Sequence, residues 1–280
     1  MVRPFGQGGA LMDWTCKAML TTATVALLLT VARLFGRRVA GLLAGMPTVT
    51  APALVWLAVE FGADFAAQAA AGSVAACGLC ALFALGYERA SRHMGPWTAL
   101  AAACASGIVL AGPAQAMRLH LGASLFLAIT LCLLVLALLP TGRRETKPQR
   151  PLRGELLITA GAAGLVTALA SVLAPHVGAF WAGVLASPPL VAAAVVVNLH
   201  VVHGRNSTQG FLRGYVAGLI GRAFFGATFA LAVVTAGMHW TLLAATSAGC
   251  IVIFVVTRAM RSPPVRGAGN ASTPAEMPFE

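Results

Sequence analysis

Arg222 is the residue with the clearest chemical potential, because it stands inside a long and mostly apolar segment. Its neighbours are Leu219-Ile-Gly-Arg-Ala-Phe-Phe225. An arginine at the centre of a membrane helix costs about 2.5–3.5 kcal/mol on insertion scales and generally faces a protein interior or an aqueous cavity. No carboxylate is expected at the same depth, so the guanidinium invites an anionic group of a ligand. The alternative is a structural role, in which Arg222 pairs with backbone carbonyls or extends to water.

Two pairs of prolines interrupt apolar segments that are otherwise long enough to form helices. Pro47 and Pro52 lie in one segment, and Pro188 and Pro189 lie in another. A proline inside a helix removes a hydrogen bond, and in lipid the freed carbonyls must face protein or a cavity. Breaks at matching places of two halves are typical of transporter binding sites, although simple packing kinks leave the same pattern. The predicted substrate-binding residues are Arg222, Pro47, Thr48, Thr50, Ser187, Pro188, Pro189 and Asn198.

The other reactive side chains indicate no catalytic or metal centre. His200 and His203 are spaced to share one helix face near Asn198, but no Cys, Asp or Glu accompanies them, which favours polar capping of a helix end. Cys77 and Cys80 have the spacing of a redox motif, yet all six cysteines lie in apolar segments, which favours helix packing. Phosphate-binding, dinucleotide-binding and zinc-protease motifs are absent from the sequence, so we expect neither a cofactor nor an enzymatic activity.

The elements that hold these residues must be helices that cross a membrane. The chain has 280 residues, of which 59% are hydrophobic and 10% are charged, and its mean hydropathy is +0.84. A soluble domain carries about 25% charged residues, so a water-soluble globular fold is excluded. A spanning helix needs about 20 mostly apolar residues. This criterion predicts an all-α polytopic membrane protein with nine transmembrane helices, at Trp14–Phe35, Val39–Glu60, Phe65–Tyr87, Trp97–Gly112, Leu119–Leu139, Leu156–Ala174, Phe180–Val202, Phe211–Thr235 and Trp240–Arg258.

Positive charges between the apolar segments predict the orientation in the membrane. Arginine and lysine cluster in alternate loops, most densely between Thr141 and Arg153, and cytoplasmic loops are the ones that carry such an excess. We therefore expect a bacterial inner-membrane protein with a periplasmic N-terminus and a cytoplasmic C-terminus. Topology and lipid headgroups account for the net charge of +11, and no nucleic acid partner is expected.

An internal repeat divides the chain into two halves. The segment 36–47 matches the segment 178–189 at six identical positions, and Gly62 meets Gly204 at the same offset. Four helices therefore correspond to four, and one unmatched helix between them places the second copy upside down in the membrane. The predicted organisation is an N-terminal periplasmic segment (1–13), a first four-helix repeat (14–112), a linker helix with a basic cytoplasmic loop (113–155), a second four-helix repeat (156–258) and a disordered cytoplasmic tail (259–280).

The segment Val39-Ala-Gly-Leu-Leu-Ala-Gly-Met-Pro-Thr48, with the helix and the glycine-spaced span that follow it, resembles the GlpM family of small bacterial inner-membrane proteins. Members of that family have about four spans and a similar Ala-Gly-Leu run followed by an aromatic-Pro-Thr step. The resemblance implies two such units fused through an extra helix. The second copy departs from the pattern at Ser187-Pro-Pro-Leu190. The resemblance implies fold and location, but it supplies no substrate.

Three functions are compatible with these features. The repeat, the prolines and Arg222 favour a transporter or permease that moves a small anionic or lipid-linked solute by alternating access of inverted halves. The second function is a non-catalytic accessory or scaffold protein of an envelope-polymer or lipid pathway, because the paired intramembrane carboxylates of proton-coupled carriers are lacking in the sequence. The third is a membrane-embedded transferase, which would need polar catalytic loops that the sequence does not display. The lipid bilayer is a partner in all three.

Overall fold

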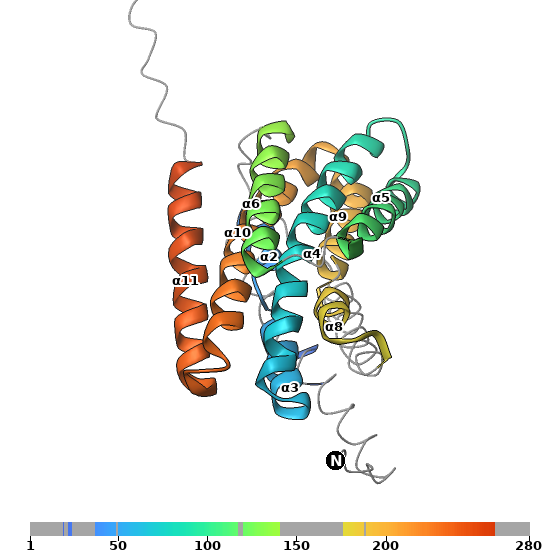
Figure 1. Ribbon diagram of the computed structural model, residues 1–280. Helices are drawn as coiled ribbons and strands as arrows, with labels where there is room; N and C mark the ends of the chain where they lie inside the picture. The colour runs from blue at the N-terminus through green and yellow to red at the C-terminus, as the bar shows by residue number, and fades with distance from the viewer. Residues whose placement is uncertain are drawn as a thin grey trace, which may run out of the picture.

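The computed structural model describes residues 19, 22–23, 37–48, 50–116, 120–140, 176–187 and 189–260, and every regular element within them is an α-helix. The predicted spans Trp14–Phe35 and Leu156–Ala174 fall wholly or almost wholly outside the described residues, as do the basic loop and the C-terminal tail. The described helices are α2 (Arg37–Gly45), α3 (Thr50–Phe61), α4 (Ala63–Ala90), α5 (Pro96–Ala116), α6 (Leu121–Leu138), α8 (Ala179–Leu185), α9 (Leu190–His203), α10 (Asn206–Ala232) and α11 (Gly237–Ala259) (Figure 1).

Several of these helices have the length and composition of membrane spans. Five segments of the described chain meet the criterion, and they correspond to the second, third, fifth, eighth and ninth predicted spans: Arg38–Phe61, Ala63–Ala90, Leu121–Leu138, Asn206–Ala232 and Gly237–Ala259. This pattern indicates a membrane protein, while the count of nine spans stays a prediction. The fourth predicted span is helical over a longer range than expected, as α5, and the seventh is divided between α8 and α9.

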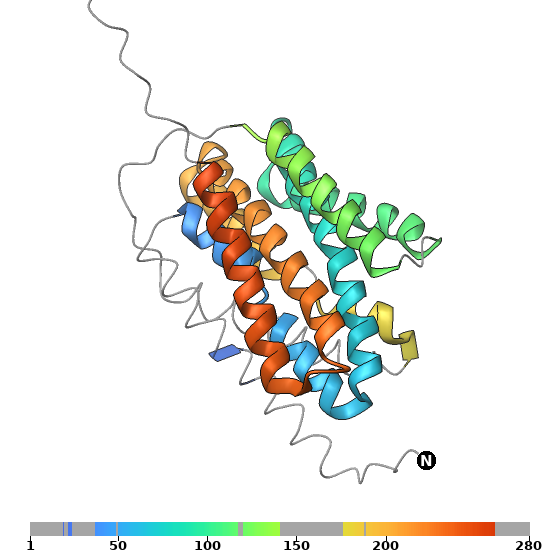
Figure 2. The same cartoon turned by 60° about the vertical axis from the view of Figure 1, so that its left-hand side comes forward.

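The helices α4 and α10 form the core of the bundle. Cys77 on α4 contacts Arg222 on α10, whereas Val74, about one turn earlier on α4, faces Gly226, about one turn later on α10. The two helices therefore run antiparallel. The helix α11 packs along the outer side of α10, which both views of the ribbon show (Figures 1 and 2).

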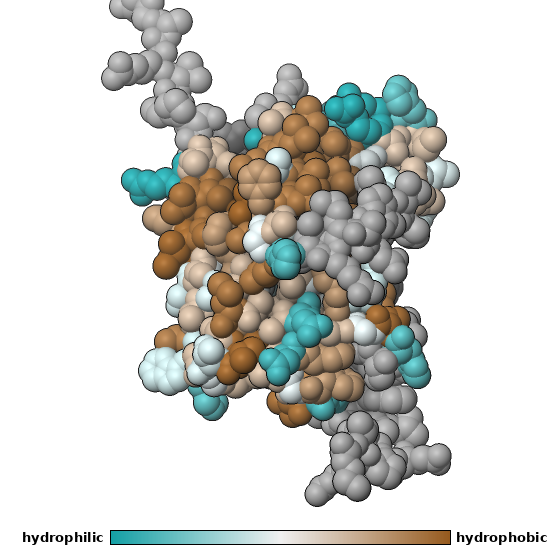
Figure 3. Space-filling model, in the orientation of Figure 1, coloured by the Kyte–Doolittle hydropathy of each residue, from teal (hydrophilic) through white to brown (hydrophobic). Residues whose placement is uncertain are grey.

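Apolar side chains are exposed on the outer helices. Phe126 on α6 is 75% exposed and Phe254 on α11 is 63% exposed. Figure 3 shows that hydrophobic side chains cover most of the coloured surface of this face, with hydrophilic ones in a few small groups. An apolar surface of this extent is unfavourable in water and favourable in a bilayer.

Both predicted helix breaks are present, with a correction at Pro52. The chain leaves the helical conformation between α2 and α3 around Pro47, and α9 begins directly after Pro189. Pro52 does not interrupt a helix, contrary to the prediction, because it is the third residue of α3. The first amide groups of a helix have no intrahelical acceptor, so a proline in the first turn removes no hydrogen bond.

The helices of the two halves have matching bounds. The start of α8 follows the start of α2 by 142 residues, and the same offset separates the ends of α9 and α3 and the ends of α10 and α4. The turns that precede α4 and α10 also match, since Gly62 and Gly204 have φ values of 91° and 76°. Glycine adopts positive φ without the steric penalty that a side chain brings. The described helices and these two turns thus share the offset of 142 residues at which the sequence predicts a repeat.

The two halves pack against each other through equivalent glycines. A side chain on Gly72 of α4 would collide with the backbone oxygen of Phe180 on α8, and one on Gly214 of α10 would collide with the backbone oxygen of Arg38 on α2. The two contacts are equivalent, because Gly214 follows Gly72 by 142 residues and Phe180 follows Arg38 by the same number. A Cβ on Gly41 would likewise collide with the backbone oxygen of Phe211, and one on Gly183 would collide with that of Ala69, which gives a second such pair.

Candidate functional site

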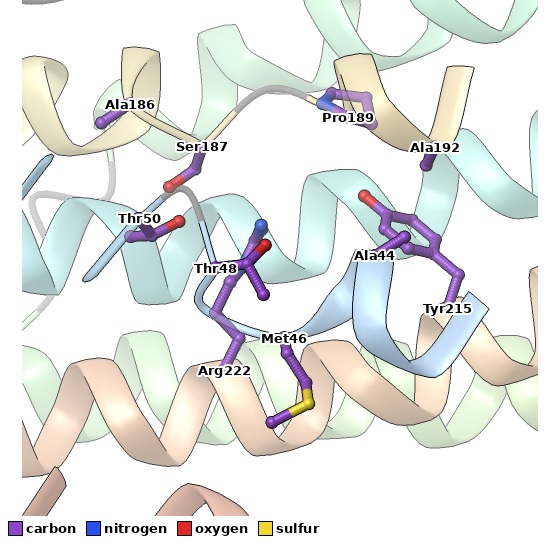
Figure 4. A pocket seen from close by; sticks show the side chains of 10 residues that line it. All are labelled: Ala44, Met46, Thr48, Thr50, Ala186, Ser187, Pro189, Ala192, Tyr215 and Arg222. Carbon is purple, nitrogen blue, oxygen red and sulfur yellow. The ribbon is translucent and has the colours of Figure 1, made fainter. Parts of the chain in front are cut away.

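A small cavity lies where the two helix breaks approach α10 (Figure 4). Its volume is about 20 Å³, counted as space for the centres of water molecules, which suffices for about one or two waters. Residues 44–50 contribute one part of the lining and residues 186–192 contribute another, so both halves of the chain build the cavity. The lining residues are Ala44, Met46, Thr48, Thr50, Ala186, Ser187, Pro189, Ala192, Tyr215 and Arg222.

Arg222 is the charged residue of this lining, and its side chain is buried with 5% exposure. Its Nε donates a hydrogen bond to the Sγ of Cys77 at 3.4 Å, and its Nη2 donates one to the Sγ of Cys80 at 3.4 Å. A guanidinium has five N–H donors, and sulfur is a weak acceptor. The described residues therefore give Arg222 two weak contacts, and its other donors are available to a ligand.

The two thiols that contact Arg222 do not neutralise its charge. Cys77 donates its own hydrogen to the backbone oxygen of Ser73 at 3.3 Å, and Cys80 donates to the backbone oxygen of Ser187 at 3.4 Å. Each thiol therefore has a backbone carbonyl as an acceptor for its hydrogen, and a thiol that keeps its hydrogen carries no charge. The ten lining residues include no carboxylate. The cavity thus presents one positive charge that no described neighbour balances.

Tyr215 supplies a second polar group. It lies on α10, about two turns before Arg222, and is 1% exposed. Its hydroxyl lies near the thiol of Cys80, but it makes no hydrogen bond of ordinary distance and angle among the described residues. A buried hydroxyl without a partner costs about 1–3 kcal/mol, so this group has a strong preference for a ligand or a water molecule in the cavity. Figure 4 shows its side chain among those that surround the cavity.

Most of the residues predicted from the sequence come together here. Thr48, Thr50, Ser187, Pro189 and Arg222 all line the cavity. Three other predicted residues do not belong to the lining: Pro47 lies in the same break as Thr48, Asn198 lies further along α9 and is half-buried, and Pro188 lies outside the described residues.

Sequence reasoning missed three residues of the site. Cys77 and Cys80 were expected to serve only helix packing, and Tyr215 was not singled out. The sequence did carry one signal, because Cys80 and Arg222 are separated by the predicted repeat offset of 142 residues. The structure brings these two side chains into contact at 3.4 Å.

A second polar cluster lies near the end of α4. The hydroxyl of Tyr87 and the Nδ1 of His200 are 3.0 Å apart, which ties α4 to α9 and agrees with a structural role for this histidine. Glu88 is 1% exposed, and its Oε1 lies 3.5 Å from the Nη2 of Arg92. Neither oxygen of this carboxylate has a hydrogen bond within the described chain. The cluster is separate from the cavity lining.

Side chains that bind metals are dispersed in the described part of the chain, where no three His, Cys, Asp or Glu residues are grouped to hold a metal ion. No family model, curated protein or solved structure matches the chain significantly.

Proposed function

We propose that the chain is a multi-pass transporter of the bacterial inner membrane that carries a small anionic solute by alternating access. In this proposal the chain has nine spans, with a periplasmic N-terminus and a cytoplasmic C-terminus. Two inverted four-helix repeats, each similar to a GlpM-like unit, are joined through the helix that contains α6. No catalytic step is assigned to the chain.

The observation that carries the proposal is the meeting of both helix breaks at one cavity with an unbalanced guanidinium. Thr48 comes from the first half, Ser187 from the second half, and Arg222 reaches the same space from α10. Discontinuous helices of two repeats are the usual way in which transporters form a substrate site. A buried arginine with only neutral thiols as partners is costly unless an anion shares the cavity.

The arrangement of the halves supports an inverted repeat. The helices α4 and α10 are antiparallel, and Figure 1 shows the turn from α4 to α5 at one end of the bundle and the turn from α10 to α11 at the other. Glycine contacts between α4 and α8 have counterparts between α10 and α2. Exchanging the two sets of contacts would move the opening of the cavity from one face of the membrane to the other.

The glycine contacts also favour sliding of one half against the other. Backbone meets backbone at Gly72 and Gly214, so no long side chain interlocks the helices at these positions. Small residues at helix contacts allow such close packing in membranes, and shear movements proceed by small displacements of packed helices. The site at the axis stays fixed while the surrounding helices move.

The proposal can be tested by osmotic swelling of liposomes that contain the purified protein. Potassium chloride, nitrate, phosphate and sulfate would be applied outside, with valinomycin and a protonophore present so that neither potassium nor proton movement limits entry. We expect protein-dependent swelling in at least one of these salts and its loss in Arg222→Met. Arg222→Lys retains the charge but not the planar fork, and should give an intermediate rate. Swelling equal to that of protein-free liposomes in every salt would contradict the proposal and favour an accessory role.

A further inference from the structure

The polar groups of the cavity define the charge that a bound solute must carry. Arg222 brings one positive charge, and the rest of the described lining is neutral. A monovalent anion therefore leaves a site with no net charge. A divalent anion leaves an excess negative charge among buried groups, whereas a neutral solute leaves the charge of the guanidinium unbalanced. Both conditions are costly in a medium of low dielectric constant.

We infer that the solute carried by the proposed transporter is a small monovalent anion held between the Arg222 guanidinium and the Tyr215 hydroxyl. This inference rests on the proposed function and adds the class of substrate and a second binding residue. The Tyr215 hydroxyl is the independent observation, because it is buried in the lining with only the weakly accepting Cys80 thiol nearby and makes no hydrogen bond of ordinary geometry among the described residues. A hydroxyl and a guanidinium are both hydrogen-bond donors, so the two groups can share one anionic ligand.

The size of the cavity agrees with this class of solute. Space for about one or two waters accommodates a halide, or a planar anion of up to about four heavy atoms such as nitrate or formate. A planar oxyanion can also accept two parallel hydrogen bonds from a guanidinium, which gives arginine an advantage over lysine. The free donors of Arg222 meet this geometry from one side, and Tyr215 meets it from its position about two turns earlier on α10.

The inference is tested by thermal unfolding of the purified full chain in detergent. Sodium nitrate, formate and chloride would be compared with sodium sulfate and phosphate at equal ionic strength, with sodium gluconate as the bulky reference. A ligand that binds only the folded state raises the unfolding temperature in a saturable manner. We expect saturable stabilisation by at least one of the small monovalent anions, and none by sulfate or phosphate.

Matched variants identify the binding groups. Tyr215→Phe should raise the half-saturating concentration about tenfold, which corresponds to 1.4 kcal/mol. Tyr87→Phe is its control, because the hydroxyl of Tyr87 bonds to His200 away from the cavity, and it should leave the half-saturating concentration unchanged. Arg222→Lys should weaken the stabilisation and Arg222→Met should abolish it. Arg213→Lys, on the same helix, should leave it unchanged.

Three results would overturn the inference. The first is equal stabilisation by all salts, and the second is absence of stabilisation by any monovalent anion. The third is stabilisation of Arg222→Lys and Tyr215→Phe with the same half-saturating anion concentration as the unsubstituted chain.

The swelling assay separates failure of this inference from failure of the proposed function. Swelling in sulfate that depends on Arg222 would retain the transporter and refute the monovalent class. Absence of swelling in every salt would refute both.

Discussion

Gly214 provides a direct test of the packing between the two halves. An alanine Cβ at this position on α10 would collide with the backbone oxygen of Arg38 and lie 3.0 Å from the backbone nitrogen of Leu42. Ordinary contacts of a Cβ lie at about 3.4–4 Å, and backbone atoms of a helix cannot rotate away as a flexible side chain can. The substitution therefore forces α2 and α10 apart, and overpacking of this kind costs about 1–3 kcal/mol.

The opposing effect has to be subtracted. Alanine is about 1 kcal/mol more favourable than glycine in a helix interior. The net expectation for Gly214→Ala is therefore a loss of about 0–2 kcal/mol in the free energy of unfolding. Gly210→Ala is a matched control one turn earlier on α10, because a Cβ there meets nothing within 4 Å. It should gain up to about 1 kcal/mol, so the difference between the two variants isolates the cost of the close contact.

Reversible unfolding of the purified chain by titration with SDS in mixed micelles would measure both values. Gly72→Ala should also be less stable than the control Gly210→Ala. Its Cβ would collide with the backbone oxygen of Phe180, in the contact that is equivalent to that of Gly214. If Gly214→Ala and Gly72→Ala are as stable as Gly210→Ala, the reciprocal packing described above is wrong.

Four further predictions follow from other contacts. Arg213→Met should lower the free energy of unfolding by about 1.5–3 kcal/mol in the same titration, because the Nη1 of Arg213 donates to two backbone oxygens at the end of α6 at 3.0 and 2.6 Å. A cysteine at Thr48, in a background without other cysteines, should react with a water-soluble thiol reagent, while a cysteine at Phe254 on the exposed apolar face should not. Reporter fusions after Gly142 and at the C-terminus should both report cytoplasm, and one at the N-terminus should report periplasm. Cys80→Asp should supply a counter-charge to the guanidinium and abolish stabilisation by monovalent anions, whereas Cys80→Asn should retain it.

The helix breaks and the cationic centre could be predicted because their causes are local. A proline lacks its amide hydrogen wherever it lies, so Pro47 and Pro189 mark breaks without knowledge of the neighbours. An arginine far from both ends of an apolar segment has to find a polar environment, which makes Arg222 conspicuous in the sequence. Pro52 was misjudged because its effect depends on where the helix starts, and helix ends are the least certain part of a sequence-based assignment.

The partners of Arg222 could not be predicted, because they depend on how the helices are rotated. The helices α4 and α10 are apolar on nearly all sides, so periodicity does not indicate which face meets which neighbour. Cys77 and Tyr215 are unremarkable in such a segment until α4 is placed against α10. Glu88 was missed for a related reason, since it lies close to the end of its helix and its burial comes from the surrounding structure.

In the proposed inverted repeat, the contact between Cys80 and Arg222 gives a reason for the two halves to differ at this site. The proposed axis would pass close to this contact, because the two residues are separated by the repeat offset of 142 residues, and near such an axis each residue meets its own equivalent. An arginine in both copies would bring two guanidiniums into contact, and a carboxylate in both would do the same with negative charges. A duplicated chain can place a single charge at its axis only if one copy loses it, and here the first half has a thiol where the second has the guanidinium. An unduplicated protein with this fold would have to assemble as a dimer with two identical residues at the axis. Fusion of the halves removes that constraint, and the unbalanced charge on which the proposed anion site depends becomes attainable.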